Sequence, residues 1–224
     1  MLSAQKRAAV LNLLNAEFPS PKPPLHFSNP FELMVAVMLS AQCTDERVNR
    51  VTPSFFPTHN TPLKMLQLGE ETLRAKIRSC GYFNQKAKNI IKASQKLIEK
   101  YHGEIPQSLE DLTSLPGVGL KSAGVVLSQA FAIPAFPVDT HVFRVANRIG
   151  LVHEKTRDKT AYALEKTLPQ DCWIDFHLQL IFHGRKTCKS QKPRCYECPV
   201  KDLCEYKKKN LVPQNTKKAY VKSS

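Results

Sequence analysis

Residues 115–124 read LPGVGLKSAG and place two glycines around a valine, directly before an apolar stretch. The segment SLEDLTSL, which ends at Leu115, has a helical pattern, and so has the segment that begins at Leu120. Glycine lets the backbone turn with a positive φ and come close to a ligand. The stretch therefore predicts two helices joined by a tight Gly-x-Gly hairpin, with Leu115 and Val118 anchoring it in the core.

A hairpin of this kind predicts a binding site for phosphate. A nucleotide-binding loop, G-x-x-x-x-G-K-[ST], is excluded, because Leu120 separates Gly119 from Lys121 and no strand precedes the loop. The free amides of the hairpin and of the next helix can instead grip a DNA backbone without sequence preference. A plain interhelical turn is the alternative. The residues expected to contact DNA here are Gly117, Val118 and Gly119.

Other segments also carry helix-start signals. Asn29-Pro30 and Thr61-Pro62 each combine a capping residue with a proline at the first helical position, and Asn84 precedes a long run that ends at Gly103. No segment shows the apolar–polar alternation of a strand. We therefore predict an all-α fold.

The charge of the chain favours a polyanionic partner. Lys and Arg number 33 against 19 Asp and Glu, which gives a net charge of +14. A basic domain without such a partner is the alternative. Residues 207–224 contain six lysines and no acidic residue, so we expect a flexible basic arm there. No segment approaches the roughly 20 apolar residues of a membrane span, and no targeting segment precedes the first helix, so we expect a location in the bacterial cytoplasm, with the nucleoid.

Seven cysteines in an intracellular chain argue against a disulfide framework. We expect Cys43, Cys80 and Cys172 to be ordinary buried thiols. The other four are close together in sequence, and their single C-x2-C pair favours an iron–sulfur cluster, although zinc remains open. The expected ligands run Cys188-x6-Cys195-x2-Cys198-x5-Cys204.

Between the first two of these cysteines lies the basic segment KSQKPR. Ligation at both ends would make it a rigid basic finger for DNA, whereas a solvated run of charges is the alternative. The candidate contacts are Lys189, Lys192 and Arg194.

The hairpin, the segment VDTHVFRVANRIG (138–150) and the cysteine spacing together resemble the endonuclease III family. These proteins are helix–hairpin–helix DNA glycosylases with one 4Fe-4S cluster, and the resemblance covers about residues 2–206. It implies a six-helix barrel domain at residues 23–133, a helical cluster domain formed by residues 1–22 and 134–206, and an active site between the two. It also implies that the protein, as a monomer, excises oxidised pyrimidines such as thymine glycol from double-stranded DNA and cleaves the strand 3′ to the abasic site.

The resemblance assigns the chemistry to two residues. Lys121 matches the family's nucleophile, whose neutral amine forms a Schiff base with the deoxyribose. Asp139 matches the carboxylate that stabilises positive charge on the sugar. On the residues alone, Lys121 could be a phosphate contact and Asp139 the N-cap of a helix.

The same resemblance suggests residues around a flipped nucleotide. Gln42 fills the vacated space in the stack, and Tyr82 stands where the family commonly has a leucine wedge. Lys86 is expected to hold a phosphate. The residues expected near the base pocket are Asp45 and His141.

Two other functions compete with this interpretation. Adenine-mismatch glycosylases share the cluster, but they lack the nucleophilic lysine and carry a catalytic glutamate near the position of Ala36. A non-catalytic DNA-binding or redox-sensing cluster protein would have no need for both Lys121 and Asp139. The preferred lesion, its opposite base and any redox role of the cluster cannot be inferred from the residues.

Overall fold

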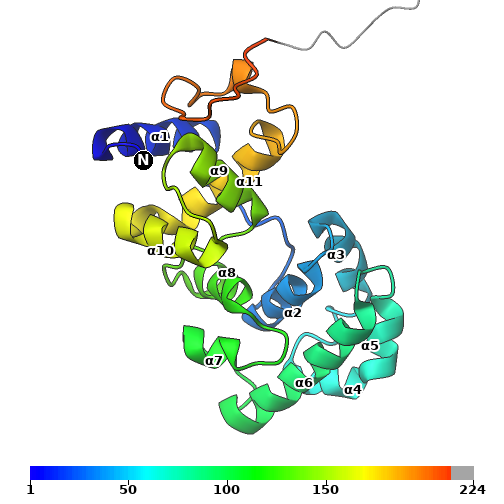
Figure 1. Ribbon diagram of the computed structural model, residues 1–224. Coiled ribbons are helices and arrows are strands. Elements are labelled where there is room, and N and C mark those ends of the chain that lie inside the picture. Colours follow the sequence, from blue (N-terminus) through cyan, green and yellow to red (C-terminus); the bar gives the residue numbers. More distant parts are fainter. Residues whose placement is uncertain (213–224) are drawn as a thin grey trace, which may run out of the picture. The chain divides into compact units, whose positions relative to one another are not determined.

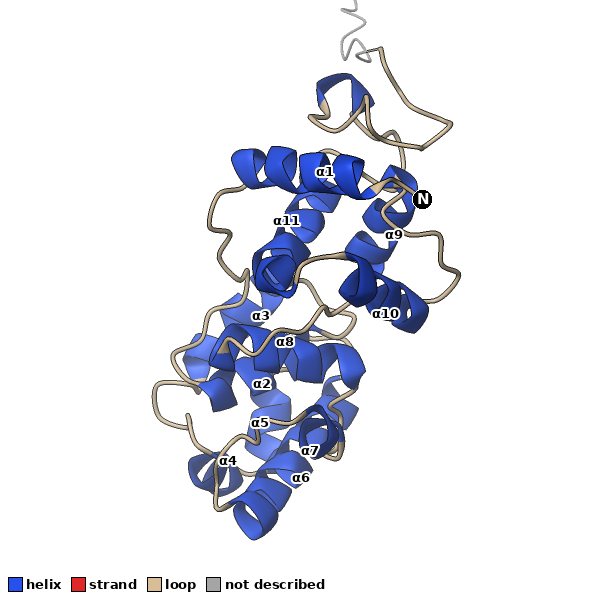
Figure 2. Ribbon diagram, turned by 90° about the vertical axis from the view of Figure 1, so that its left-hand side faces the viewer, coloured by secondary structure: helices blue, strands red, loops and turns tan. Residues whose placement is uncertain are grey.

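The computed structural model describes residues 1–212, and these residues form helices and loops without a strand, as Figure 2 shows. The prediction of an all-α fold is confirmed. The chain divides into two compact units. We name the unit of Lys22–Pro137 and Pro169–Ile174 the hairpin unit, and the unit of Met1–Pro21, Val138–Leu168 and the described residues from Asp175 onward the cysteine unit.

These units differ from the predicted domains in their boundaries. The barrel domain was expected to end at residue 133, whereas the hairpin unit continues to Pro137 and also takes in Pro169–Ile174. The predicted basic arm at 207–224 lies outside the described residues from position 213 on.

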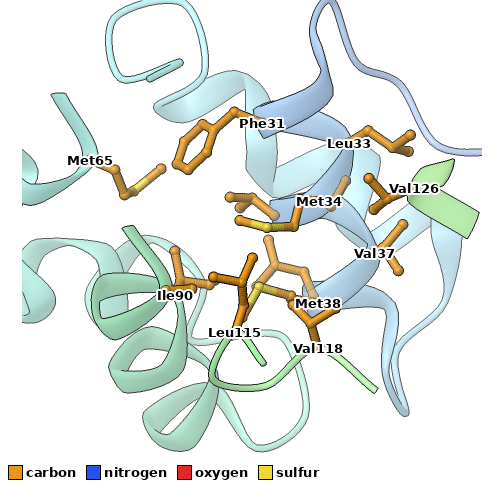
Figure 3. Close-up of a cluster of buried hydrophobic side chains, with 14 of the residues drawn as sticks. Phe31, Leu33, Met34, Val37, Met38, Met65, Ile90, Leu115, Val118 and Val126 are labelled. Carbon is orange, nitrogen blue, oxygen red and sulfur yellow. The ribbon is translucent and has the colours of Figure 1, made fainter. Parts of the chain in front are cut away.

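The hairpin unit is built around α2 (Pro30–Ser40), which packs against α3, α6 and α8. Every residue from Phe31 to Leu39 is buried, and Figure 3 shows several of these side chains within one apolar cluster. Figure 1 labels the other α-helices of this unit, which are α3 (Asp45–Val51), α4 (Pro62–Leu68), α5 (Glu70–Lys76), α6 (Phe83–Tyr101), α7 (Leu109–Thr113) and α8 (Leu120–Phe131). The unit also contains the 3-10 turns η1 (Thr52–Ser54) and η2 (Gln170–Cys172).

The cysteine unit joins the two ends of the chain. The backbone amide of Leu2 donates to the Gly150 carbonyl at 2.7 Å, and Gln179 Nε2 donates to Asn15 Oδ1 at 3.0 Å. Such links hold the N-terminal helix on the C-terminal part. The elements of this unit are α1 (Ala4–Glu17), α9 (Thr140–Ile149), α10 (Arg157–Thr167), nearly all of α11 (Trp173–Lys186) and η3 (Cys195–Glu197).

The helix starts test the capping signals. Asn29 and Thr61 are the N-caps of α2 and α4, and their side chains accept from Glu32 N and Lys64 N. The start expected after Asn84 is wrong, because α6 begins at Phe83. Tyr82 takes the N-cap position in a left-handed conformation, and no capping side chain marks that turn. Among residues 1–212, no helix is long and apolar enough to cross a membrane.

Candidate functional site

The hairpin between α7 and α8 has the predicted form. Gly117 adopts a φ of +82°, and Val118 N donates to the Leu115 carbonyl at 3.1 Å. Leu115 and Val118 are buried, and Figure 3 shows both in the cluster that contains Met38. The expected anchoring of the hairpin in the core is confirmed.

The outer side of the hairpin leaves backbone amides open. Gly119 is the N-cap of α8 and supplies no capping side chain, and a Cβ atom added there would meet nothing within 4 Å. Lys121, the second residue of α8, is exposed. Because the first amides of a helix have no partner within it, this end of α8 suits an approaching phosphate.

Two loops of the hairpin unit place Gln42 and Tyr82 side by side. Both residues are exposed and have left-handed backbones, with φ of +51° and +57°. A Cβ added at Gly81 would lie 3.0 Å from the Gln42 carbonyl oxygen, so the two loops are in contact. The Tyr82 side chain is 68% exposed and therefore free to stack on a base.

Asp45 begins a helix, and Lys86 differs from its expected setting. Asp45 is the first residue of α3, and the cap of that helix is Thr44. The expected phosphate contact of Lys86 is corrected by the structure. Lys86 is buried, and its ammonium donates to the Leu39 carbonyl at 2.7 Å, at the end of α2. Burial lowers the pKa of Lys86, and nearby Cys43 and Cys80 act in the opposite direction.

In the cysteine unit, Asp139 is the N-cap of α9, and its Oδ1 accepts from Val142 N at 2.8 Å. His141, in the first turn, lies 3.2 Å from Arg144 Nη2 through its Nδ1. Burial lowers the pKa of His141, and the charge of Asp139 opposes that effect. Burial thus favours the neutral form of the His141 ring.

One pocket is lined by the four cysteines that were expected to bind a cluster, together with His183, Thr187 and Tyr206. Burial raises the pKa of Cys198 to about 12 and also raises the pKa values of the Cys188 and Cys204 thiols. Among residues 1–212, no three His, Cys, Asp or Glu side chains converge as ligands of one metal ion.

The basic loop between Cys188 and Cys195 is fastened by its own backbone. Arg194 N donates to the Thr187 carbonyl at 2.9 Å. Lys189 and Lys192 are exposed, but Arg194 is paired with Glu197 at 2.8 Å. The two lysines are thus the freer cations of the loop.

Arg144 and Arg148 on α9 hold this loop, and the sequence reasoning missed both. Arg144 donates to the Cys188 carbonyl at 3.1 Å, and Arg148 donates to the Lys189 and Ser190 carbonyls at 2.6 and 2.9 Å. Their spacing of four residues, which puts them on one face of a helix, was the available signal. A groove beside them brings His141 and Lys189 together and is lined by His141, Arg144, Gly184, Arg185, Lys189, Ser190 and Gln191.

Lys121 belongs to the hairpin unit, whereas Asp139 and the cysteines belong to the cysteine unit. Within the first unit, the structure gathers the Gln42 and Tyr82 loops. Within the second, it gathers the four cysteines in one pocket, and His141 with Lys189 in one groove.

Comparison with known proteins identifies the family of this chain. Residues 35–170 match the family described as HhH-GPD superfamily base excision DNA repair protein. Endonuclease III of Haemophilus influenzae is 47% identical over 208 residues, which cover 93% of this chain and 99% of that protein. The chain belongs to the endonuclease III family. Endonuclease III of Escherichia coli is 46% identical with the same coverage, and that of Bacillus subtilis is 46% identical over 91% of this chain and 94% of that protein. As a member of the endonuclease III family, the protein is a base excision repair enzyme of the DNA glycosylase and AP lyase class.

Solved structures agree with this placement in the endonuclease III family. A trapped endonuclease III–DNA covalent intermediate superimposes with a TM-score of 0.87 at 43% identity and covers 92% of this chain and 97% of that chain. A thermostable thymine-DNA glycosylase superimposes with a TM-score of 0.82, covers 90% of this chain and 96% of that chain, and at 24% identity shows the shared fold alone.

Proposed function

We propose that this enzyme removes oxidised pyrimidines, such as thymine glycol, from double-stranded DNA and then cleaves the strand 3′ to the abasic site by β-elimination. The observation that carries the proposal is the exposed amine of Lys121, held at the uncapped start of α8 directly after the hairpin. A nucleophile in this place lies next to the amides that would hold the DNA backbone. A 43% identical relative whose solved structure is a covalent intermediate with DNA supports it.

Lys121 acts as the nucleophile. Its neutral amine attacks the sugar carbon that carries the damaged base, the base leaves, and the ring opens to a Schiff base. The iminium draws electrons from the neighbouring carbon, which loses a proton, and the 3′ phosphate leaves. The hairpin amides at Gly117, Val118 and Gly119 hold the backbone during these steps.

Asp139 supplies negative charge to the same reaction. One carboxylate oxygen is committed to Val142 N, and this bond orients the group at the start of α9. The charge stabilises the positive sugar that forms while the glycosidic bond breaks. Nδ1 of His141 accepts from Arg144 Nη2, so the neutral ring, which burial favours by lowering its pKa, keeps its proton on Nε2 as a donor in the base pocket, where we also place Asp45.

DNA contacts extend beyond the hairpin. We assign Gln42 and Tyr82 to the space left by the flipped nucleotide, since both are exposed on neighbouring loops. Lys189 and Lys192 contact phosphates, with Arg194 at the base of their loop. The enzyme works on the bacterial chromosome as a monomer, which light scattering can test. The bacterial origin of the relatives supports a location in the cytoplasm, with the nucleoid.

Four cysteines would hold one 4Fe-4S cluster. The residues fit such a group, because four thiols line one pocket and because Arg148 Nη1 and Tyr206 N lie 3.8 and 3.5 Å from the sulfurs of Cys188 and Cys204. The single C-x2-C pair favours this cluster over one zinc ion, since structural zinc sites usually combine two such pairs. When bound, the cluster would supply cross-linking that fixes both ends of the basic loop.

Borohydride trapping tests the proposal. Wild type should form a trapped complex on duplexes that carry thymine glycol or an abasic site, but not on an adenine mismatch, because Lys121 is present and the buried Ala36 has no carboxylate. Lys121→Ala should lose the complex and keep DNA affinity within about tenfold, since at most one phosphate contact is removed. Lys88→Ala, which changes another exposed lysine of the same unit, is the control. Undiminished trapping by Lys121→Ala would refute the assignment.

Asp139→Asn tests the second role. The amide oxygen keeps the N-cap bond to Val142 N, so the melting temperature should stay within a degree or so. Base excision should fall by about 10²-fold or more, because the charge is lost. A loss smaller than about threefold would leave Asp139 as a cap alone.

A further inference from the structure

Two cysteines outside the proposed catalytic groups lie on neighbouring loops. Cys43 and Cys80 were expected to be ordinary buried thiols, but they are neighbours: after burial, the Cys43 thiol is the next cause that raises the pKa of Cys80. Cys80 is 1% exposed and belongs to the core, whereas Cys43 is half-buried at its edge. The loops that carry them touch, as the close approach of Gly81 to the Gln42 carbonyl shows.

Positive charges face this pair of thiols. The buried ammonium of Lys86 interacts with both sulfurs, and Arg47 of α3 also acts on Cys80. A cation beside a thiol favours the reactive thiolate. Burial nevertheless raises the pKa of Cys80 to about 11, so the half-buried Cys43 is the thiol that an oxidant in solution meets first.

We propose that Cys43 and Cys80 form a reversible disulfide when the enzyme meets hydrogen peroxide, and that this bond slows base excision. In the first step the Cys43 sulfur bonds to one peroxide oxygen, the O–O bond breaks, and water leaves, which gives a sulfenic acid. In the second step the Cys80 sulfur attacks the Cys43 sulfur, the S–O bond breaks, and a second water leaves. The two thiols lose two electrons, and the peroxide oxygens gain them.

The bond needs a small movement. A disulfide requires a distance of about 2.05 Å between the two sulfurs, so the sulfurs must move together. Cys43 can supply this movement, because it lies in the exposed loop between α2 and α3, whereas Cys80 is fixed in the core.

The disulfide would affect the residues next to its two cysteines. Gln42 directly precedes Cys43, and Tyr82 follows Cys80 by two residues. This step rests on the proposed function, in which both side chains enter the DNA. A covalent tie between the loops fixes the separation of the two groups, and a displacement of about 1 Å at such a site can cost 10²-fold in rate.

Two readouts on the full-length holoenzyme test the proposal. Wild type, Cys43→Ala, Cys80→Ala and Cys172→Ala are treated with hydrogen peroxide, alkylated and digested, and peptides joined through residues 43 and 80 are identified by mass. The single-turnover excision rate is measured before oxidation, after oxidation and after reduction with dithiothreitol. Cluster absorption is followed in each sample. Cys172, a half-buried thiol bonded to the Pro169 carbonyl, provides the matched control.

Wild type and Cys172→Ala should yield the linked peptide and lose at least about tenfold in rate, with recovery on reduction. Cys43→Ala should keep its excision rate after oxidation, with unchanged cluster absorption. This variant alone still tests the proposal if Cys80→Ala fails to fold. Absence of the linked peptide in oxidised wild type, or linked protein that excises at the reduced rate, overturns the proposal. If reduced wild type excises no lesion, the proposed function fails, and the peptide analysis still decides whether the disulfide forms.

Discussion

Gly117→Ala should destabilise the hairpin unit for two separable reasons. An alanine at φ +82° costs about 1–2 kcal/mol in the left-handed region. Its Cβ would also lie 2.8 Å from Asn89 Nδ2, 2.9 Å from Asn89 Cβ and 3.0 Å from Met38 Cε, an overpacking that typically costs about 1–3 kcal/mol. Together these predict a loss of about 2–5 kcal/mol in the free energy of unfolding.

Gly103→Ala isolates the first of these two effects. Gly103 has nearly the same φ, +83°, but an added Cβ would meet nothing within 4 Å. This variant should lose only about 1–2 kcal/mol. Chemical denaturation of both variants, followed by circular dichroism, gives the comparison. Equal losses in the two variants would refute the packing argument, because the contacts with Asn89 and Met38 would then contribute nothing.

Two further predictions concern α9. Because burial lowers the pKa of His141, the unfolded chain takes up its proton first as the pH falls below about 6.5, so acidification lowers the stability of the fold. In pH-dependent melts, His141→Gln should therefore lose less stability on acidification than wild type, whereas a variant at an exposed histidine, His26→Gln, should behave like wild type. Equal acid sensitivity of wild type and both variants would contradict this. Arg148→Met removes the bonds to the Lys189 and Ser190 carbonyls, so the free energy of unfolding, from thermal melts, should fall by about 1–3 kcal/mol and cluster absorption should decay faster. The control is Arg157→Met, which changes an exposed arginine. Unchanged decay in Arg148→Met would show that the loop does not depend on Arg148.

The features that the sequence predicted correctly depend on interactions between residues that are close together in the chain. The N-caps at Asn29 and Thr61 follow from neighbouring residues, because a cap bonds to an amide three positions away. The hairpin was predictable for the same reason, since its glycines lie between two short helical patterns. Tyr82 gave no such signal, because a left-handed tyrosine is unusual, and the start of α6 was therefore misplaced.

Partners distant in sequence account for what was missed. Lys86 looked like a surface cation, but it meets the Leu39 carbonyl 47 positions away. The contact between the loops of Cys43 and Cys80 arises in the same way, from packing that no local pattern encodes. The same holds for the bonds from Arg148 to the basic loop.

The complete burial of α2 has a consequence during synthesis. Its residues from Phe31 to Leu39 leave the ribosome long before α6 and α8, the helices that cover them, and α8 ends only at Phe131. From Ser40 to Phe131 the ribosome adds 91 residues, which takes roughly 5–18 s at 5–20 residues per second. For that interval the nascent chain presents an uncovered apolar segment, the kind of surface that chaperones bind, so the central helix of the folded unit is prone to aggregation in the unfinished one.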